Sequence, residues 1–226
     1  MEKITVKFGG SSLADADQIR KAAAIINEDT ARRYIVVSAP GKRFPGDDKV
    51  TDLLYSAYYE ARNHQDFHET MDKVKRRFYA IRDALPADVD LDREFEVIEG
   101  RLLSDPDRDY MASRGEYLNG KLMAAFLGFN FLNPQELILF NDDGKLNEEE
   151  TNRKLYYALG QVRHAVIPGF YGSLRNGKIR TFSRGGSDVT GSLVARASES
   201  EVYENWTDVS GLLFTDPNIV KNPRTI

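Results

Sequence analysis

The sequence predicts an α/β fold with a mainly parallel sheet, and three observations lead to this class. Short apolar strands alternate with amphipathic helices along almost the whole chain. Near the N-terminus a strand, a glycine-rich turn, a helix and a second strand follow one another, which is the order of a parallel βαβ unit. Because no repeat or low-complexity linker divides the 226 residues, a single domain is expected.

The βαβ unit occupies the first 38 residues. Its first strand is predicted at residues 3–8 and ends in two glycines. A helix is predicted at residues 15–27, since apolar residues recur there on one helical face. The apolar stretch "YIVVS", residues 34–38, is the second strand and is bounded by Ala-Pro-Gly.

The middle of the chain is predicted to be mostly helical. Residues 67–85 have the clearest amphipathic pattern, with apolar side chains at three- and four-residue steps, which indicates core packing. A short helix is also expected just before "SDPD". The other helices are expected at residues 50–62, 108–127, 148–159 and 189–197.

Further strands are predicted in the second half of the chain. The stretch "ELILF", residues 136–140, is strand-like, and "HAVIPGFYG" is a second apolar stretch broken at Pro168-Gly169. Asn176-Gly177 between alternating flanks predicts a hairpin turn. A last strand is expected to end at Thr207-Asp208.

The composition excludes several classes of function. With no cysteine, the chain has no disulfide, thiolate nucleophile or cysteine-bound zinc. The three histidines lie outside any recognisable catalytic motif, and no metal-ligand residue is predicted. A formal net charge of −4 with scattered basic residues argues against nucleic-acid binding. No apolar stretch approaches the roughly 20 residues of a membrane helix, and no signal peptide is visible, so a cytoplasmic protein is expected.

Two glycine turns indicate where an anion could bind. Lys7 precedes "GGSS", and "SRGGSD", residues 183–188, opens a later helix. Glycine lets backbone N–H groups approach an anion, and a helix N-terminus adds partial positive charge. One such turn alone is more often an ordinary turn, but two turns beside charged side chains suggest a polyphosphate bound from two sides. Neither is a P-loop, because that motif places its lysine after the glycines.

The motifs "VKFGGSS", "VVSAPGKR" followed by "VTD", "SRGE", "VIPGFYG", "SRGGSD" and "WTDVSGLLFTDP" occur in this order from residue 3 to about residue 219. In this order they resemble the catalytic domain of the aspartokinases, in the amino acid kinase family. The resemblance implies a three-layer sandwich with helices on both faces of the sheet. It also implies an aspartate-binding part at about residues 1–190 and the start of a nucleotide-binding part at about 191–226.

The resemblance assigns expected roles to residues of the glycine turns. Lys7 would stabilise the phosphoryl group in transfer, and Asp188 would hold Lys7 in place. Phosphate would be bound by the residues of both turns, namely Gly9, Gly10, Ser11, Gly185, Gly186 and Ser187.

The resemblance also implies a substrate site and a nucleotide site. Arg184 would receive the α-carboxylate of the substrate and Glu116 its α-amino group, with Ser38 and Thr51 beside them. The nucleotide pocket would include Thr207, Asp208, Leu213 and Asp216. One residue of that pocket differs from the family pattern "TDVPGIYTTDP": Leu213 stands where tyrosine is usual. Family members continue beyond this loop into further core segments and ACT domains, so a C-terminally truncated catalytic domain is expected.

The implied activity is transfer of the γ-phosphoryl group of ATP, with Mg²⁺, to the β-carboxylate of L-aspartate, within amino-acid biosynthesis. A carboxylate with a pKa near 3.9 is already ionised at neutral pH, so this reaction needs no general base. Two alternatives stay open: another family member that resembles N-acetylglutamate kinase, and a truncated binding module without catalysis. The expected partners are the small molecules L-aspartate and ATP, and a homodimer stays open.

Overall fold

The protein has a parallel sheet at its centre, seen in a computed structural model that describes residues 2–183 and 185–207. Within these residues five strands pair in the order β3-β5-β2-β1-β8, and every pairing in this sheet is parallel. The strands are β1 (Ile4–Phe8), β2 (Arg32–Val37), β3 (Asn130–Phe131), β5 (Ala165–Pro168) and β8 (Val202–Trp206).

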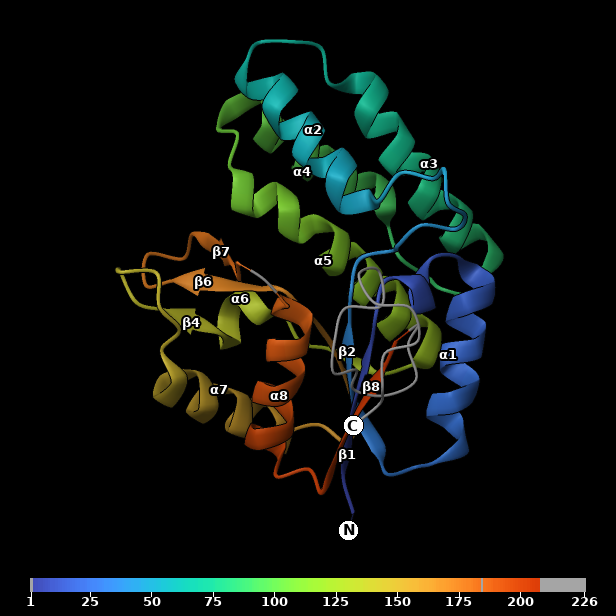
Figure 1. Cartoon of the computed structure of the whole chain (residues 1–226), viewed down its shortest axis with the longest axis vertical. Coiled ribbons are helices and arrows are strands. Elements are labelled where there is room, and N and C mark those ends of the chain that lie inside the picture. The colour runs from blue at the N-terminus through green and yellow to red at the C-terminus, as the bar shows by residue number, and fades with distance from the viewer. Residues whose placement is uncertain (1, 184, 208–226) are drawn as a thin grey trace, which may run out of the picture.

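Helices cover both faces of this sheet, which confirms the predicted three-layer sandwich. Successive side chains of a strand point to opposite faces. Val6, Ile35 and Val37 belong to a core shared with helices α1 to α5, whereas Val36 and Ile167 pack with α7 and α8. Figure 1 shows α1 and α8 on opposite sides of the strands. The helices of the first core are α1 (Ala16–Glu28), α2 (Val50–Arg62), α3 (His68–Ala84), α4 (Leu91–Ser104) and α5 (Arg108–Leu127).

The second face carries α7 (Glu148–Gly160), α8 (Gly186–Ser198) and a small second sheet. That sheet has the order β4-β6-β7, with strands β4 (Leu139–Phe140), β6 (Tyr171–Leu174) and β7 (Ile179–Thr181). Strands β6 and β7 are antiparallel, and Gly177 in their turn has φ +82°, a conformation that glycine adopts readily. The hairpin predicted at Asn176-Gly177 is therefore confirmed.

Some predicted element boundaries were wrong. The expected strand at residues 136–140 begins instead as a short helix, α6 (Pro134–Leu137), and only Leu139–Phe140 are strand. The side chain of Asn133 accepts a hydrogen bond from the Gln135 N–H at 3.2 Å, and Pro134 follows at the first helical position, where its missing N–H costs nothing. The helix before "SDPD" is longer than expected at 14 residues, and β3 was not predicted.

Helix α8 begins three residues before the predicted start at residue 189. Gly185 has φ +58°, and its carbonyl accepts from the Val189 N–H at 2.9 Å, so the chain enters the helix directly from the glycine turn. The glycines of the turn are thus at the helix N-terminus itself. None of the helices in the described residues is long and apolar enough to cross a membrane.

Candidate functional site at the carboxyl edge of the parallel sheet

The strand register places Lys7 in the middle of the sheet, one residue before the end of β1. Its Cα lies opposite those of Val36 in β2 and Asn205 in β8. Alternation along β1 directs Lys7 away from the core that holds Val6 and Phe8, and therefore toward α8. Lys7 is only 7% exposed, and a cation so buried requires a partner.

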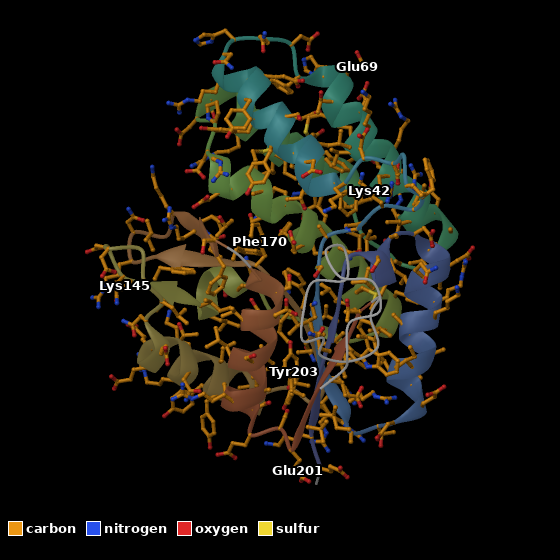
Figure 2. The ribbon with its side chains drawn as sticks, viewed as in Figure 1. Lys42, Glu69, Lys145, Phe170, Glu201 and Tyr203 are labelled. Atoms are coloured by element: carbon orange, nitrogen blue, oxygen red, sulfur yellow. The ribbon has the colours of Figure 1, made fainter. Side chains whose placement is uncertain are left out.

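That partner is Asp188, in the first turn of α8. Lys7 Nζ lies 2.8 Å from Asp188 Oδ1, and the Asn205 side-chain amide donates to the same oxygen at 3.1 Å. Tyr203, labelled beside α8 in Figure 2, donates from its hydroxyl to the Asp188 carbonyl at 3.3 Å. Burial, together with the nearby carboxylate, raises the pKa of Tyr203 to about 12, so this hydroxyl remains a donor at neutral pH. The lysine predicted to contact the phosphoryl group is therefore fixed by the aspartate predicted to hold it.

The two glycine turns lie on either side of this ion pair. A Cβ atom added at Gly9 would be 3.8 Å from Lys7 Nζ, and one added at Gly185 would be 3.8 Å from Asp188 Oδ2. The Gly9 N–H donates to the carbonyl of Trp206 at 3.0 Å, and the Trp206 ring stacks on Phe8 with centroids 6.3 Å apart. Residues far apart in the sequence thus meet at one edge of the sheet, as the sequence predicted.

A cavity of about 520 Å³ opens from the first glycine turn. Gly10 and Ser11 form one wall, and the segment of residues 38–51 that follows β2 forms most of the other. Five residues that the sequence placed in the phosphate and substrate sites line this cavity together: Gly10, Ser11, Ser38, Thr51 and Glu116. Its volume is within the range of about 300–1,000 Å³ that is usual for small-molecule sites.

Glu116 is the buried acid of the cavity and is 6% exposed. The Ala39 N–H donates to its carboxylate, but Oε2 has no hydrogen-bond partner. Burial raises the pKa of Glu116 to about 8, against the smaller opposing effects of the backbone hydrogen bonds and of Arg114. A buried carboxylate with a free acceptor atom in a cavity is suited to bind a cationic group.

Helix α5 holds the end of β2 against this acid. Asn119, one turn after Glu116, donates from its side-chain amide to the Ser38 carbonyl at 2.7 Å. Gly115 packs so closely that an added Cβ would lie 2.7 Å from the Ala39 side chain. Gly115, next to Glu116 in the sequence, therefore permits close packing of α5 against the end of β2.

The structure does not describe every predicted site residue. Arg184, Asp208, Leu213 and Asp216 lie outside the described residues, while Thr207 is exposed just after β8. Ser187 lies at the start of α8, where a Cβ on Gly169 would be 2.6 Å from its hydroxyl.

The sequence reasoning missed several residues near the site: Asn119, Asn205, Lys42 and Lys49. Strand alternation was the available signal for Asn205, because it follows Tyr203 by two residues in the last strand. The two lysines were visible only as part of a polar loop. Figure 2 shows Lys42 on the segment that passes between α1 and α3.

The fold and this edge define a class of protein. Ligands of open α/β sheets bind outside the carboxyl ends of the parallel strands, and here glycine turns, a helix N-terminus, a buried lysine and a buried carboxylate meet at that edge. The class is an open α/β protein with a charged cavity at the carboxyl edge of its parallel sheet. The amino acid kinase family model matches residues 2–226, and the chain belongs to the amino acid kinase family.

The chain is similar to several aspartokinases. The chain is 36% identical over 236 aligned residues to Aspartokinase 3 of Bacillus subtilis, covering 98% of this chain and 52% of that protein. The crystal structure of Clostridium acetobutylicum aspartate kinase superposes with a TM-score of 0.92 at 44% identity, covering all of this chain and 52% of the other. Escherichia coli aspartokinase III in complex with aspartate and ADP has a TM-score of 0.83 at 25% identity, with 53% of its chain covered. The chain thus spans about half the length of these relatives.

Proposed function

We propose that this chain carries the aspartate-phosphorylating site of an aspartate kinase, which forms 4-phospho-L-aspartate and ADP from L-aspartate and ATP. One observation carries the proposal: the Lys7–Asp188 pair lies between two glycine turns, next to a cavity whose buried acid has a free acceptor atom. The similar proteins support it, because one was solved with aspartate and ADP bound.

The proposed reaction is a direct displacement. An oxygen of the β-carboxylate attacks the γ-phosphorus of ATP, the bond from that phosphorus to the β,γ-bridging oxygen breaks, and ADP leaves with the electron pair. The attacking group is already an anion at neutral pH, so no proton has to be removed. What the protein must supply is position and positive charge. Lys7 supplies the charge, and its ion pair with Asp188 keeps the ammonium at one place.

Recognition of aspartate follows from the charges of the substrate. In this proposal Glu116 binds the α-amino group, which provides the hydrogen-bond donors and positive charge that Oε2 lacks in the free protein. Arg184 binds the α-carboxylate, for which the planar guanidinium is well suited. An N-acylated amino acid has no ammonium group for the ionised form of Glu116 to bind, and this argues against an N-acetylglutamate kinase-like activity.

The residues present fit ATP with Mg²⁺. Apart from the Gly9 N–H, which is bonded to the Trp206 carbonyl, the backbone donors of the two glycine turns and the Lys7 cation suit phosphate oxygens. Within the described part of the chain no three acidic or histidine side chains gather as a metal-binding group. Mg²⁺ commonly binds through substrate phosphates and water with one or two carboxylates, so it would be held mainly by the phosphates of the nucleotide and would offset their negative charge.

The test is an ADP-release assay with L-aspartate and, separately, with N-acetylglutamate. We expect turnover with aspartate only, and a loss of about 10²–10³-fold in kcat for Lys7→Met, in the range found when one transition-state donor is removed. Lys145→Met is the matched control, because this lysine is 82% exposed and lies at the outer end of the small sheet (Figure 2). Turnover of N-acetylglutamate, or normal turnover by Lys7→Met, would refute the proposal. Calorimetric binding of aspartate and ATP without ADP release would indicate a binding module instead.

A further inference from the structure

The cavity has a wall made by a loop, and this loop is anchored by a buried guanidinium that lies outside the cavity. Arg77, in the middle of α3, is 6% exposed. Its Nη1 lies 2.5 Å from Asp47 Oδ2, and Asp47 is itself 8% exposed. A charge pair buried to this extent requires a full set of hydrogen bonds to offset its desolvation.

Arg77 uses its remaining donors on two backbone carbonyls from different segments. Nε donates to the Ala14 carbonyl at 3.2 Å, at the end of the turn that follows β1. Nη2 donates to the Gly41 carbonyl, in the segment that follows β2. One planar side chain therefore ties together the two chain segments that leave the carboxyl ends of the central strands.

Both segments contribute walls of the cavity. Gly10 and Ser11 belong to the first wall, and Gly41, Lys42 and Lys49 belong to the second. The walls also touch directly, since the Gly41 N–H donates to the Gly10 carbonyl at 2.8 Å and an added Cβ at Gly41 would lie 2.6 Å from the Gly10 carbonyl carbon.

Asp47 extends the anchor to the outer part of the loop. Its carboxylate accepts from the Arg43 backbone N–H at 3.0 Å and from the Arg43 guanidinium at 2.7 and 2.8 Å. The hydrogen bonds from Arg43 and Arg77 hold the pKa of Asp47 well below its usual range. The carboxylate is therefore charged at neutral pH and keeps both arginines in place.

We propose that Arg77 is a positioning residue for the aspartate site, acting through Asp47 and Gly41 to fix the segment of residues 40–49 over the cavity. This inference rests on the proposed function, which assigns that cavity to aspartate. A purely structural role would be limited to global stability, because Arg77 is not among the residues that line the cavity. A positioning role predicts that aspartate binding weakens in a protein that stays folded.

The experiment compares Arg77→Lys with Arg76→Lys. Lysine keeps the positive charge but cannot reach three acceptors as a planar fork does. Arg76 is the exposed neighbour on the same helix, so its variant controls for the chemistry of the exchange. Four values are measured on the otherwise unchanged chain. They are the calorimetric affinities for L-aspartate and for ATP, and the rates of hydrogen exchange at the amides of Gly41 and Arg43. Asp47→Asn provides a second variant if Arg77→Lys does not fold.

For Arg77→Lys we expect about tenfold faster exchange at both amides and about tenfold weaker aspartate binding, with ATP affinity within twofold of the parent chain. Arg76→Lys should match the parent in all four measurements. Faster exchange with unchanged aspartate affinity would overturn the proposal, and so would weaker affinity with unchanged exchange. A parent chain that binds no aspartate would refute the proposed function, while the exchange data would still decide whether Arg77 holds the segment.

Discussion

Glu116 is the buried acid of the candidate site. Its carboxylate is enclosed by α5 and the end of β2, with one oxygen unpaired. A pKa of about 8 means that this side chain is mostly protonated at pH 7 in the free protein. If the substrate ammonium binds to the ionised form, binding must release a proton.

The first prediction concerns the pH dependence of aspartate binding. Below pH 8 the protein must lose a proton from Glu116 to bind the ammonium, so affinity should increase as the pH rises from 6 toward 8, by up to about tenfold per pH unit. Calorimetry in two buffers of different ionisation enthalpy would also detect the released proton. The isosteric Glu116→Gln variant should bind aspartate weakly with a flat pH profile. An equally steep profile in that variant would show that another group titrates.

The same pKa has a consequence for the free protein. Because the pKa of Glu116 is raised above its unfolded value, the stabilisation from its protonated form is complete below about pH 4.5 and is lost as the pH rises through about 8. Burying an acid that ionises near neutral pH lowers the stability of the folded protein. Such a residue is consistent with a role in binding.

At the scale of elements, the site depends on how closely α5 approaches β2. Gly115 allows this approach, since the Ala39 side chain occupies the space that a Cβ would need. The resulting contact places Glu116 and Asn119 next to Ser38 and Ala39.

The second prediction compares two helical glycines. Gly115→Ala should destabilise the protein by about 1–3 kcal/mol, the usual cost of overpacking a filled interior. Gly100→Ala is the control, because a Cβ at Gly100 in α4 meets no atom within 4 Å. There the better helix propensity of alanine should stabilise by about 0.5–1 kcal/mol. Urea unfolding would measure both, and equal effects would contradict the close-packing argument.

Much of the element structure could be predicted because its signals are local. Helices α2 and α5 have the predicted bounds, and α5 begins after Asp107, whose side chain accepts from the Tyr110 N–H, and ends at Gly128 with φ +67°. Strand β3 was missed for a physical reason. A two-residue strand such as β3 carries no periodic signal, and it exists because it pairs with β5.

The candidate site was predictable to the extent that its motifs are contiguous. The turns around Lys7 and Asp188 and the acid Glu116 could be found in the sequence, and the structure brings them to one edge of the sheet. The Arg77–Asp47 pair could not be found, because its members are 30 residues apart and the stretch around Asp47 resembles any polar, proline-containing loop. No feature of the neighbouring sequence distinguishes a buried aspartate at this position from an exposed one.

At the scale of the whole molecule, the site joins parts of the chain that are distant in sequence. Its described residues come from β1 and the turn after it, the segment after β2, the first turn of α2, the middle of α5, the start of α8 and β8. A ligand that contacts these elements together binds only the folded arrangement, and its binding must therefore stabilise the entire domain.

The third prediction follows from this linkage. Aspartate at about 100 times its dissociation constant should raise the free energy of unfolding by about 2.7 kcal/mol. At the same aspartate concentration Glu116→Gln should lose most of this gain, whereas Lys145→Met should keep it. Denaturant unfolding with and without aspartate would measure the difference. Equal stabilisation of all three proteins would place the aspartate site elsewhere.

Trp206 is the only tryptophan of the 226 residues. Its indole stacks on Phe8, its N–H donates to Glu204 at 2.8 Å, and its carbonyl receives the Gly9 N–H at the first glycine turn. The tryptophan fluorescence of the chain therefore originates next to the proposed phosphate-binding edge. Emission spectra and quenching could follow nucleotide binding there without any added dye.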